Sequence, residues 1–236
     1  MNQEKKEITL DKRIIFALDV STPEEAKQWV TKLKSHIKFY KVGLQLFLAD
    51  WFNIIEWIVA QDLEVMVDLK FFDIPETVAL AVNQLRGKGI SFTTVHGNDK
   101  ILKAAVDAKG EIKLLAVTVL TSLDDADLKD LGFQCAAKEL VLSRAKRGLQ
   151  LGCDGVVSSG LEAPQLRRDL GNNFLIVVPG VRPITNDVDD QKRVVTIKDA
   201  FLNGADHVVI GRPIRQAKDP ILVIEEMQTE IKNSKF

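Results

Sequence analysis

The stretch Glu64-Val65-Met66-Val67-Asp68-Leu69-Lys70-Phe71-Phe72-Asp73-Ile74-Pro75-Glu76-Thr77 joins a strand signal to a helix signal. Its β-branched, apolar start is typical of a buried strand, and Pro75 stands where a helix begins. Side chains alternate along a strand, so we expect Asp68 and Lys70 to face the same way. Charged groups packed at a strand end are costly to desolvate, which favours a role toward a ligand. A structural salt bridge that caps the following helix is the alternative interpretation.

Similar β-branched runs occur along the whole chain and alternate with helical patterns. The other runs are residues 13–19, 36–42, 91–96, 113–121, 155–158, 174–178 and 207–210. Eight β–α units of roughly 30 residues each predict an α/β fold, a (β/α)8 TIM barrel that forms a single domain over residues 1–236. A doubly wound open sheet is the alternative, but the chain lacks the early Gly-x-Gly-x-x-Gly turn typical of that fold.

The intervals between these runs carry helix signals. Thr22 followed by Pro23 is typical of a helix N-terminus, and Thr196 can cap a later helix. In the second interval Phe47, Trp51 and Ile54 recur at helical spacing. We therefore expect Trp51 to lie on the buried face of that helix.

The overall composition excludes several classes of protein. The chain has 236 residues, of which 46% are hydrophobic and 28% charged, and its net charge is -1. Such a balance provides no basic surface for nucleic acid or for an anionic membrane, and we expect neither as a partner. No apolar run approaches the roughly 18 residues of a membrane helix.

The cysteines and the first residues indicate a cytoplasmic protein. Cys135 and Cys153 are the two cysteines of the chain, and neither belongs to a metal-binding pair. Few cysteines are typical of a reduced, cytosolic compartment. Residues 1–7 are polar and mixed in charge, unlike a signal peptide or a transit peptide.

Polar residues follow each predicted strand, at the barrel end where active sites gather. In strand order they are Asp19, Lys41, Asp68 with Lys70, His96, Thr121 with Ser122, Ser158 with Ser159, Arg182, and Gly211 with Arg212. A barrel that served only as a scaffold would not need polar groups at every strand end. The pattern therefore predicts an active site at this end.

The ends of the last two strands predict a phosphate site. Gly180 and Gly211 remove side chains, so that backbone amides can approach an anion, and Arg182 and Arg212 add permanently charged donors. Plain turns with solvated arginines are the alternative. The long polar stretch of residues 182–193 predicts a mobile lid over this site.

The charged strand ends also predict chemistry at a carbon atom. Flanking carboxylates would hold Lys70 as an ammonium, aimed at an atom where negative charge develops. Asp19 and Lys41 would bind sugar hydroxyls, unless they form only a surface ion pair. A metal has little support, because Lys70 lies between Asp68 and Asp73 and would compete with Mg²⁺ for their charge.

Short motifs surround the strand ends along the chain. They are Phe16-Ala17-Leu18-Asp19, Lys41-Val42-Gly43, the segment from Asp68 to Thr77, Val95-His96-Gly97, Val119-Leu120-Thr121-Ser122, Pro179-Gly180-Val181-Arg182-Pro183 with Gln191, and Val209-Ile210-Gly211-Arg212. Together they resemble the orotidine 5′-phosphate decarboxylase family in its bacterial form, in the family order and over nearly the whole chain. The chain departs from the pattern at Glu76, where asparagine is usual.

The resemblance implies an activity and a role for each site residue. It implies decarboxylation of orotidine 5′-phosphate to UMP, the last step of UMP synthesis, without a cofactor and in a homodimer with shared sites. The implied roles are proton donation by Lys70, contact with the substrate carboxylate by Asp68, ribose binding by Asp19 and Lys41, pyrimidine contact by Thr121, phosphate binding by Arg182, Gln191, Gly211 and Arg212, and entry of Asp73 and Thr77 into the partner subunit's site.

Two other functions remain open on the sequence. The central motif is shared with a wider suprafamily, which includes Mg²⁺-dependent sugar-phosphate lyases and decarboxylases. A barrel that binds a phosphate ligand without catalysis is the third interpretation. Sensitivity to a chelator separates the first two, and turnover separates both from the third.

Overall fold

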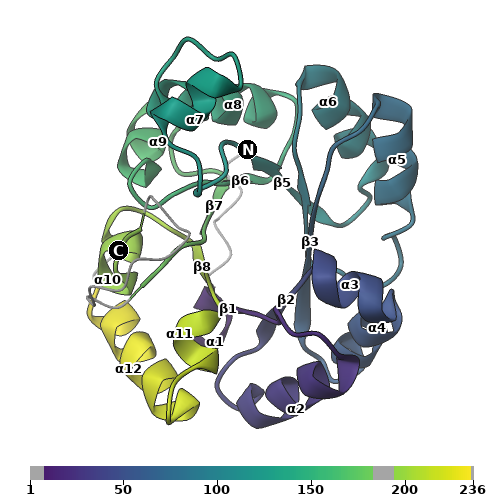
Figure 1. The fold of residues 1–236 in the computed structure, drawn as a ribbon, viewed down its shortest axis with the longest axis vertical. Coiled ribbons are helices and arrows are strands. Elements are labelled where there is room, and N and C mark those ends of the chain that lie inside the picture. The colour runs from purple at the N-terminus through teal and green to yellow at the C-terminus, as the bar shows by residue number, and fades with distance from the viewer. Residues whose placement is uncertain (1–7, 183–193, 235–236) are drawn as a thin grey trace.

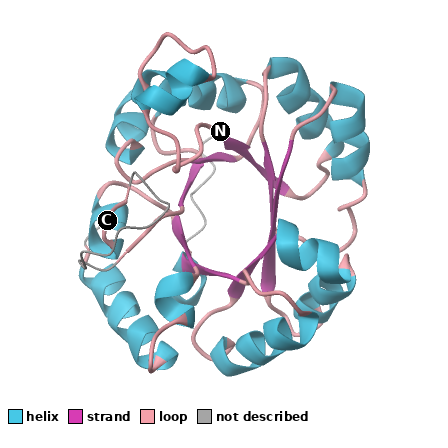
Figure 2. Cartoon of the chain, viewed as in Figure 1, coloured by secondary structure: helices cyan, strands magenta, loops and turns pink. Residues whose placement is uncertain are grey.

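Eight parallel strands close into a barrel, and helices surround it on the outside (Figure 1, Figure 2). The computed structural model describes residues 8–182 and 194–234. Each strand pairs with the next in chain order, and β8 pairs with β1, which confirms the predicted (β/α)8 barrel. The strands are β1 (Ile14–Ala17), β2 (Phe39–Gly43), β3 (Glu64–Phe71), β4 (Phe92–Val95), β5 (Lys113–Val117), β6 (Gly155–Val157), β7 (Leu175–Val178) and β8 (His207–Ile210).

Helices follow the strands and cover their outer faces. Across the described ranges they are α1 (Leu10–Arg13), α2 (Pro23–Leu33), α3 (Leu44–Asp50), α4 (Asn53–Val59), α5 (Pro75–Asn83), α6 (Asp99–Ala108), α7 (Asp125–Asp130), α8 (Ala137–Gln150), α9 (Ala163–Leu170), α10 (Ile197–Leu202), α11 (Arg212–Arg215) and α12 (Pro220–Asn233). As predicted, Thr22 caps α2 and Thr196 caps α10 through their side chains. Within the described part of the chain, every helix is too short or too polar to span a bilayer.

All eight predicted runs overlap a strand, although most of the ends differ. The run 13–19 becomes β1 at residues 14–17, and the run 113–121 becomes β5 at residues 113–117. Strand pairing ends where the chain turns outward, so Asp19 and Thr121 lie in loops just beyond their strands. Loops at the carboxyl ends of barrel strands are where site residues are expected.

The barrel interior is packed with side chains. Phe39 and Phe92 meet edge to face with ring centroids 4.9 Å apart, and Met66, Leu115 and Val209 belong to the same buried cluster. This filled interior closes the barrel beneath its carboxyl end. Within the ring of strands, the space for a ligand therefore lies above this packed layer.

His207 has a structural role at the opposite end of the barrel. Its Nδ1 atom donates a hydrogen bond to the Lys12 carbonyl oxygen at 2.8 Å, and its ring packs against Phe39 and Phe92. Burial lowers the pKa of His207 to about 4. The imidazole is therefore neutral at physiological pH and takes no part in the chemistry at the other end.

The expectation for Trp51 is wrong. Helix α3 ends at Asp50, and Trp51 follows with a left-handed backbone at φ 51°. The left-handed turn breaks the helical spacing that would have placed Trp51 beside Ile54, and Trp51 is 62% exposed. Two short helices, α3 and α4, therefore replace the single helix that the spacing predicts.

Gly155 provides a test of packing in the barrel wall. A Cβ atom there would clash with the carbonyl oxygen of Leu175 and lie 2.6 Å from Leu175 Cβ. Both atoms belong to a neighbouring strand and cannot move away cheaply, so we expect Gly155→Ala to lower the free energy of unfolding by about 3 kcal/mol. Urea unfolding at fixed protein concentration measures this change.

Gly132→Ala is the control for Gly155→Ala. A Cβ atom at Gly132 meets no atom within 4 Å, so only its left-handed backbone, at φ 86°, resists the change. We expect a loss of about 1 kcal/mol there. Equal losses in the two variants would show that the packing at Gly155 has been misjudged.

Candidate active site

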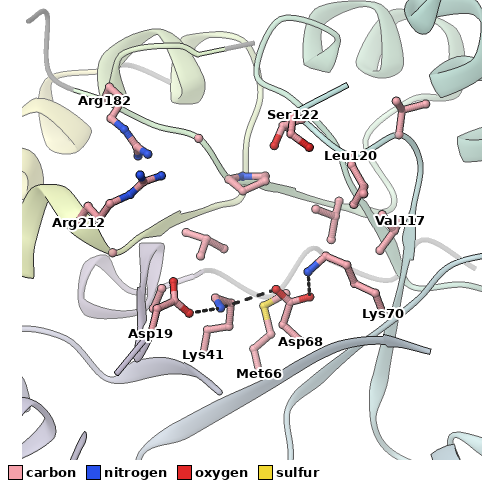
Figure 3. A pocket seen from close by; sticks show the side chains of 18 residues that line it. Asp19, Lys41, Met66, Asp68, Lys70, Val117, Leu120, Ser122, Arg182 and Arg212 are labelled. Atoms are coloured by element: carbon pink, nitrogen blue, oxygen red, sulfur yellow. Dashed lines mark hydrogen bonds and ion pairs between the residues drawn. The ribbon is translucent and has the colours of Figure 1, made fainter. Parts of the chain in front are cut away.

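A cavity of about 240 Å³ opens at the carboxyl end of the barrel (Figure 3). It is lined by eight of the eleven predicted site residues: Asp19, Lys41, Asp68, Lys70, Thr121, Arg182, Gly211 and Arg212. Lys41, Asp68 and Lys70 lie in β2 and β3, and the other five lie just beyond the ends of β1, β5, β7 and β8. The cavity therefore lies where the strand ends predicted a site.

Four of these residues form a row of alternating charges. The Nζ atom of Lys41 lies 2.9 Å from Asp19 Oδ1 and 3.8 Å from Asp68 Oδ2. The Nζ atom of Lys70 lies 2.9 Å from Asp68 Oδ1. Figure 3 shows the row along one side of the cavity, with Lys70 at its end. Such a row can stabilise charge on a ligand while its own charges cancel.

An irregularity in β3 presents Lys70 to the cavity. The pairing of β3 with β4 shifts register between Val67 and Phe71, and Lys70 has a left-handed backbone at φ 49°. Residues other than glycine rarely adopt this backbone conformation. Asp68 and Lys70 do share a face, as predicted, although they lie in a bulge where the regular strand pairing is interrupted.

Asp68 stays ionised although it is nearly buried, with 13% of its side chain exposed. Burial alone would raise the pKa of its carboxyl group. The charges of Lys41 and Lys70, with hydrogen bonds from Lys70 and Thr94, outweigh burial and hold that pKa below its ordinary value. The carboxylate is therefore fully charged at neutral pH.

The two arginines lie across the cavity from Lys70. Figure 3 shows the Arg182 and Arg212 side chains pointing toward each other, on the side opposite Lys70. Arg212 is the first residue of α11, and Gly211, directly after β8, is the N-cap residue of that helix. Two guanidinium groups that converge in this way can bind a doubly charged oxyanion such as phosphate.

The structure leaves three predicted site residues outside this cavity. Asp73 and Thr77 are exposed and do not line it. The carboxylate of Asp73 accepts a hydrogen bond from the Ile74 amide at 2.6 Å. Gln191 lies outside the described residues, as does the predicted lid at residues 182–193 except for Arg182.

The helix-capping alternative for the central motif is wrong. Ile74 occupies the cap position of α5 and makes no side-chain cap bond. Asp68 instead forms ion pairs with Lys41 and Lys70, and the Thr94 hydroxyl hydrogen-bonds both the Asp68 carboxylate and the Lys70 amide. The charged pair therefore faces the cavity and not the helix.

Residues beyond the predicted set also shape the cavity. The apolar lining includes Ala17, Met66, Val117, Val157 and Val209. All but Val117 belong to the barrel's inner cluster or pack against it. Alternation along the strands could have identified Met66, because it lies two residues before Asp68 and faces the same way. These side chains offer a flat ligand an apolar surface beside the charged row.

Metal-binding potential is low among the residues that the structure describes. In these ranges no group of three or more His, Cys, Asp or Glu side chains is arranged to hold a metal ion. Asp68, one of the two acids that line the cavity, is already neutralised by two lysines.

Comparison with known proteins shows which family this chain resembles. Residues 12–227 match the Orotidine 5'-phosphate decarboxylase / HUMPS family. The orotidine 5′-phosphate decarboxylase of Methylococcus capsulatus is 54% identical over 230 residues, which cover 97% of this chain and 95% of that protein. The enzyme of that name from Xanthomonas euvesicatoria is 44% identical over 223 residues, or 93% of this chain and 92% of that protein.

A solved structure agrees with these sequence matches. The crystal structure of orotidine 5′-phosphate decarboxylase from Lactobacillus acidophilus superposes with a TM-score of 0.82 and 35% identity, covering 93% of this chain and 99% of that one. Family match, relatives and fold all extend over nearly the whole chain. The chain therefore belongs to the Orotidine 5'-phosphate decarboxylase / HUMPS family.

Proposed function

We propose that this chain decarboxylates orotidine 5′-phosphate to UMP and CO2, in the last step of pyrimidine nucleotide synthesis, without a metal or cofactor. One observation carries the proposal: the row from Asp19 to Lys70 faces Arg182 and Arg212 across one cavity. The ligand that fits has a phosphate at one end and a reacting carbon at the other. The relatives named orotidine 5′-phosphate decarboxylase support this substrate.

The phosphate of the substrate binds between Arg182 and Arg212. Gly211 brings the backbone close to the anion, and its missing side chain leaves room, since a Cβ atom there would lie 3.2 Å from Ala17 Cβ. The family resemblance implies that Gln191 also binds this phosphate. Binding energy from the phosphate, which is remote from the reacting carbon, can serve to orient the ring in the transition state.

The ribose and the pyrimidine fill the space between the arginines and Lys70. Asp19 and Lys41 hydrogen-bond the ribose hydroxyls, and Thr121 lies against the ring. The apolar side chains of Met66, Val117 and Val209 give the flat ring a surface on which to pack. Carbon C6 of the pyrimidine then faces Lys70.

The reaction needs charge stabilisation and a proton. When the bond from C6 to the carboxyl carbon breaks, its electron pair stays on C6 in the ring plane, where no π system delocalises it. The ammonium of Lys70 stabilises this charge and donates its proton to C6. CO2 departs from the side of Asp68, and Lys70, with 37% of its side chain exposed, recovers a proton from water.

A second copy of the chain completes the site. Asp73 and Thr77 are exposed and lie outside their own cavity, where they are available to a partner subunit. Phe72 and Ile74 flank Asp73 and are 69% and 66% exposed. Large apolar side chains at this exposure are typical of a surface that a partner covers, so the active enzyme in this proposal is a homodimer with shared sites.

Turnover in excess chelator tests the proposal. Purified protein with orotidine 5′-phosphate and EDTA should remove the orotate absorbance at the rate seen without EDTA. Activity that the chelator abolishes would favour a Mg²⁺-dependent member of the suprafamily. Tight UMP binding without turnover would favour the non-catalytic phosphate-binding barrel, and either result would reject the proposal.

Gly43 offers a test of the ribose end. A Cβ atom at this position would lie 3.0 Å from Lys41 Nζ and 3.5 Å from Asp19 Oδ1. The backbone at Gly43, with φ -97°, accepts any L residue, so only the lysine tip must move. We expect Gly43→Ala to raise KM about tenfold, equivalent to about 1.4 kcal/mol of binding, with the unfolding midpoint unchanged. An unchanged KM would remove Lys41 and Asp19 from the binding site.

A further inference from the structure

Thr94 lies in β4 directly beside the irregular part of β3. Val67 pairs with Thr93, and the next pair is Phe71 with Val95. Thr94 is therefore the β4 residue opposite the bulge that contains Asp68 and Lys70. Its side chain is fully buried, and it does not line the cavity. No contact with a ligand is therefore expected from Thr94 itself.

The Thr94 hydroxyl bonds both members of the catalytic pair. Its Oγ1 atom accepts a hydrogen bond from the Lys70 amide at 3.0 Å and donates one to Asp68 Oδ1 at 2.9 Å. The same carboxylate oxygen accepts the ammonium of Lys70 at 2.9 Å. One hydroxyl thus fixes the backbone of Lys70 and the counter-ion of its side chain.

The Thr94 hydroxyl supplies the hydrogen-bond acceptor that the Lys70 amide needs in the bulge. The left-handed backbone of Lys70, at φ 49°, is rare for a lysine, and the register shift takes its amide out of the regular strand pairing. A buried amide needs an acceptor. An apolar side chain at residue 94 would leave that amide unsatisfied, and the conformation that aims Lys70 into the cavity would lose its support.

We propose that Thr94 is a positioning residue, which sets the Lys70 ammonium at the place where it donates its proton. This inference rests on the proposed function, which assigns proton donation to Lys70. The position of an ammonium group matters because a misplacement of about 1 Å in an active site can cost about 10²-fold in rate. Thr94 acts through Asp68 and Lys70 without touching the substrate.

Thr94→Val removes the hydroxyl and keeps the shape of the side chain. We expect kcat for orotidine 5′-phosphate to fall about 100-fold while KM changes less than about threefold, because the phosphate and ribose ends are untouched. Thr94→Ser keeps the hydroxyl and should retain kcat within about threefold of wild type. Thr94→Ala provides a second variant without the hydroxyl if the valine variant does not fold.

Thr93→Val is the matched control. Thr93 is the neighbouring residue of the same strand and is also fully buried, and its hydroxyl donates to the Val67 carbonyl oxygen at 3.2 Å. Thr93→Val removes one buried hydroxyl, just as Thr94→Val does, but that hydroxyl bonds neither Asp68 nor Lys70. We expect its kcat to stay within about threefold of wild type.

Crystal structures of wild type and Thr94→Val separate this inference from the proposed function. The inference predicts that the contact of 2.9 Å between Lys70 Nζ and Asp68 Oδ1 is lost in the variant, whether or not wild type turns over the substrate. Wild type without turnover rejects the proposed function and leaves this prediction standing. An intact contact, or equal falls in kcat for the Thr93 and Thr94 variants, overturns the role of Thr94.

Discussion

Lys70→Ala is expected to lower kcat for orotidine 5′-phosphate by at least about 10³-fold. An ammonium about 4 Å from a developing unit charge contributes about 4 kcal/mol at an effective dielectric constant near 20, which is roughly three decades of rate. Loss of the proton donor adds to this effect. Steady-state assays of orotate absorbance measure kcat, with Lys103→Ala as control, because Lys103 forms only an exposed ion pair with Asp107.

The same variant should keep its fold and its product binding. UMP carries no carboxylate beside Lys70, and in the proposed site its phosphate binds at the opposite end, between Arg182 and Arg212. Calorimetry should therefore give a Kd for UMP within about threefold of wild type, and circular dichroism should be unchanged. A kcat within tenfold of wild type would contradict the role of Lys70 as proton donor.

Lys70 alone does not account for the whole expected acceleration. Enzymes that act on very slow reactions lower the barrier by up to about 23 kcal/mol, several times the contribution of one ammonium. In the proposed site, phosphate binding by Arg182 and Arg212 supplies further binding energy that can be realised in the transition state. In the proposed mechanism Asp68, charged and nearly buried, also repels the substrate carboxylate, and the departure of CO2 relieves this repulsion.

Asp73→Ala is expected to lower kcat by at least about 10²-fold, and mixing it with Lys70→Ala should restore activity. In the proposed dimer each site takes Lys70 from one subunit and Asp73 from the other. After subunit exchange in an equal mixture, half of the dimers contain both variants, and each of these has one unaltered site. The mixture should therefore recover about a quarter of the wild-type activity.

Mixing Lys70→Ala with Asp68→Ala is the matched control. Asp68 and Lys70 belong to one cavity of one subunit, with Nζ and Oδ1 2.9 Å apart, so each site of a mixed dimer carries one defect. No recovery is expected. If the mixture of Lys70→Ala with Asp73→Ala also recovered no activity, the result would contradict the shared site and place Asp73 outside the chemistry.

The strand pattern predicted the barrel because parallel strands are buried on both faces. Such strands appear as short β-branched apolar runs, and each of the eight runs became a strand. Helices were less predictable. Helix α9 has only Ala163 and Leu166 buried, too few to form a recognisable periodicity, and the spacing around Trp51 was broken by a left-handed turn.

The site was predictable where it depends on residue type at strand ends. Asp19, Lys41, Asp68 and Lys70 gather at one cavity because a closed barrel brings the ends of parallel strands together. The left-handed backbone of Lys70 has no compositional signal, because glycine is the residue that marks such a conformation. Thr94 was missed for a related reason: its hydrogen bonds depend on the register shift between β3 and β4.

A crystal structure with UMP bound tests the central claim most directly. The account predicts the phosphate between Arg182 and Arg212, and carbon C6 of the pyrimidine about 3 Å from Lys70 Nζ, close enough for proton transfer in a bound complex. Asp73 of the partner subunit should lie beside that ammonium. A phosphate bound at the Lys70 end, or a pyrimidine with C6 turned away from Lys70, would contradict the account.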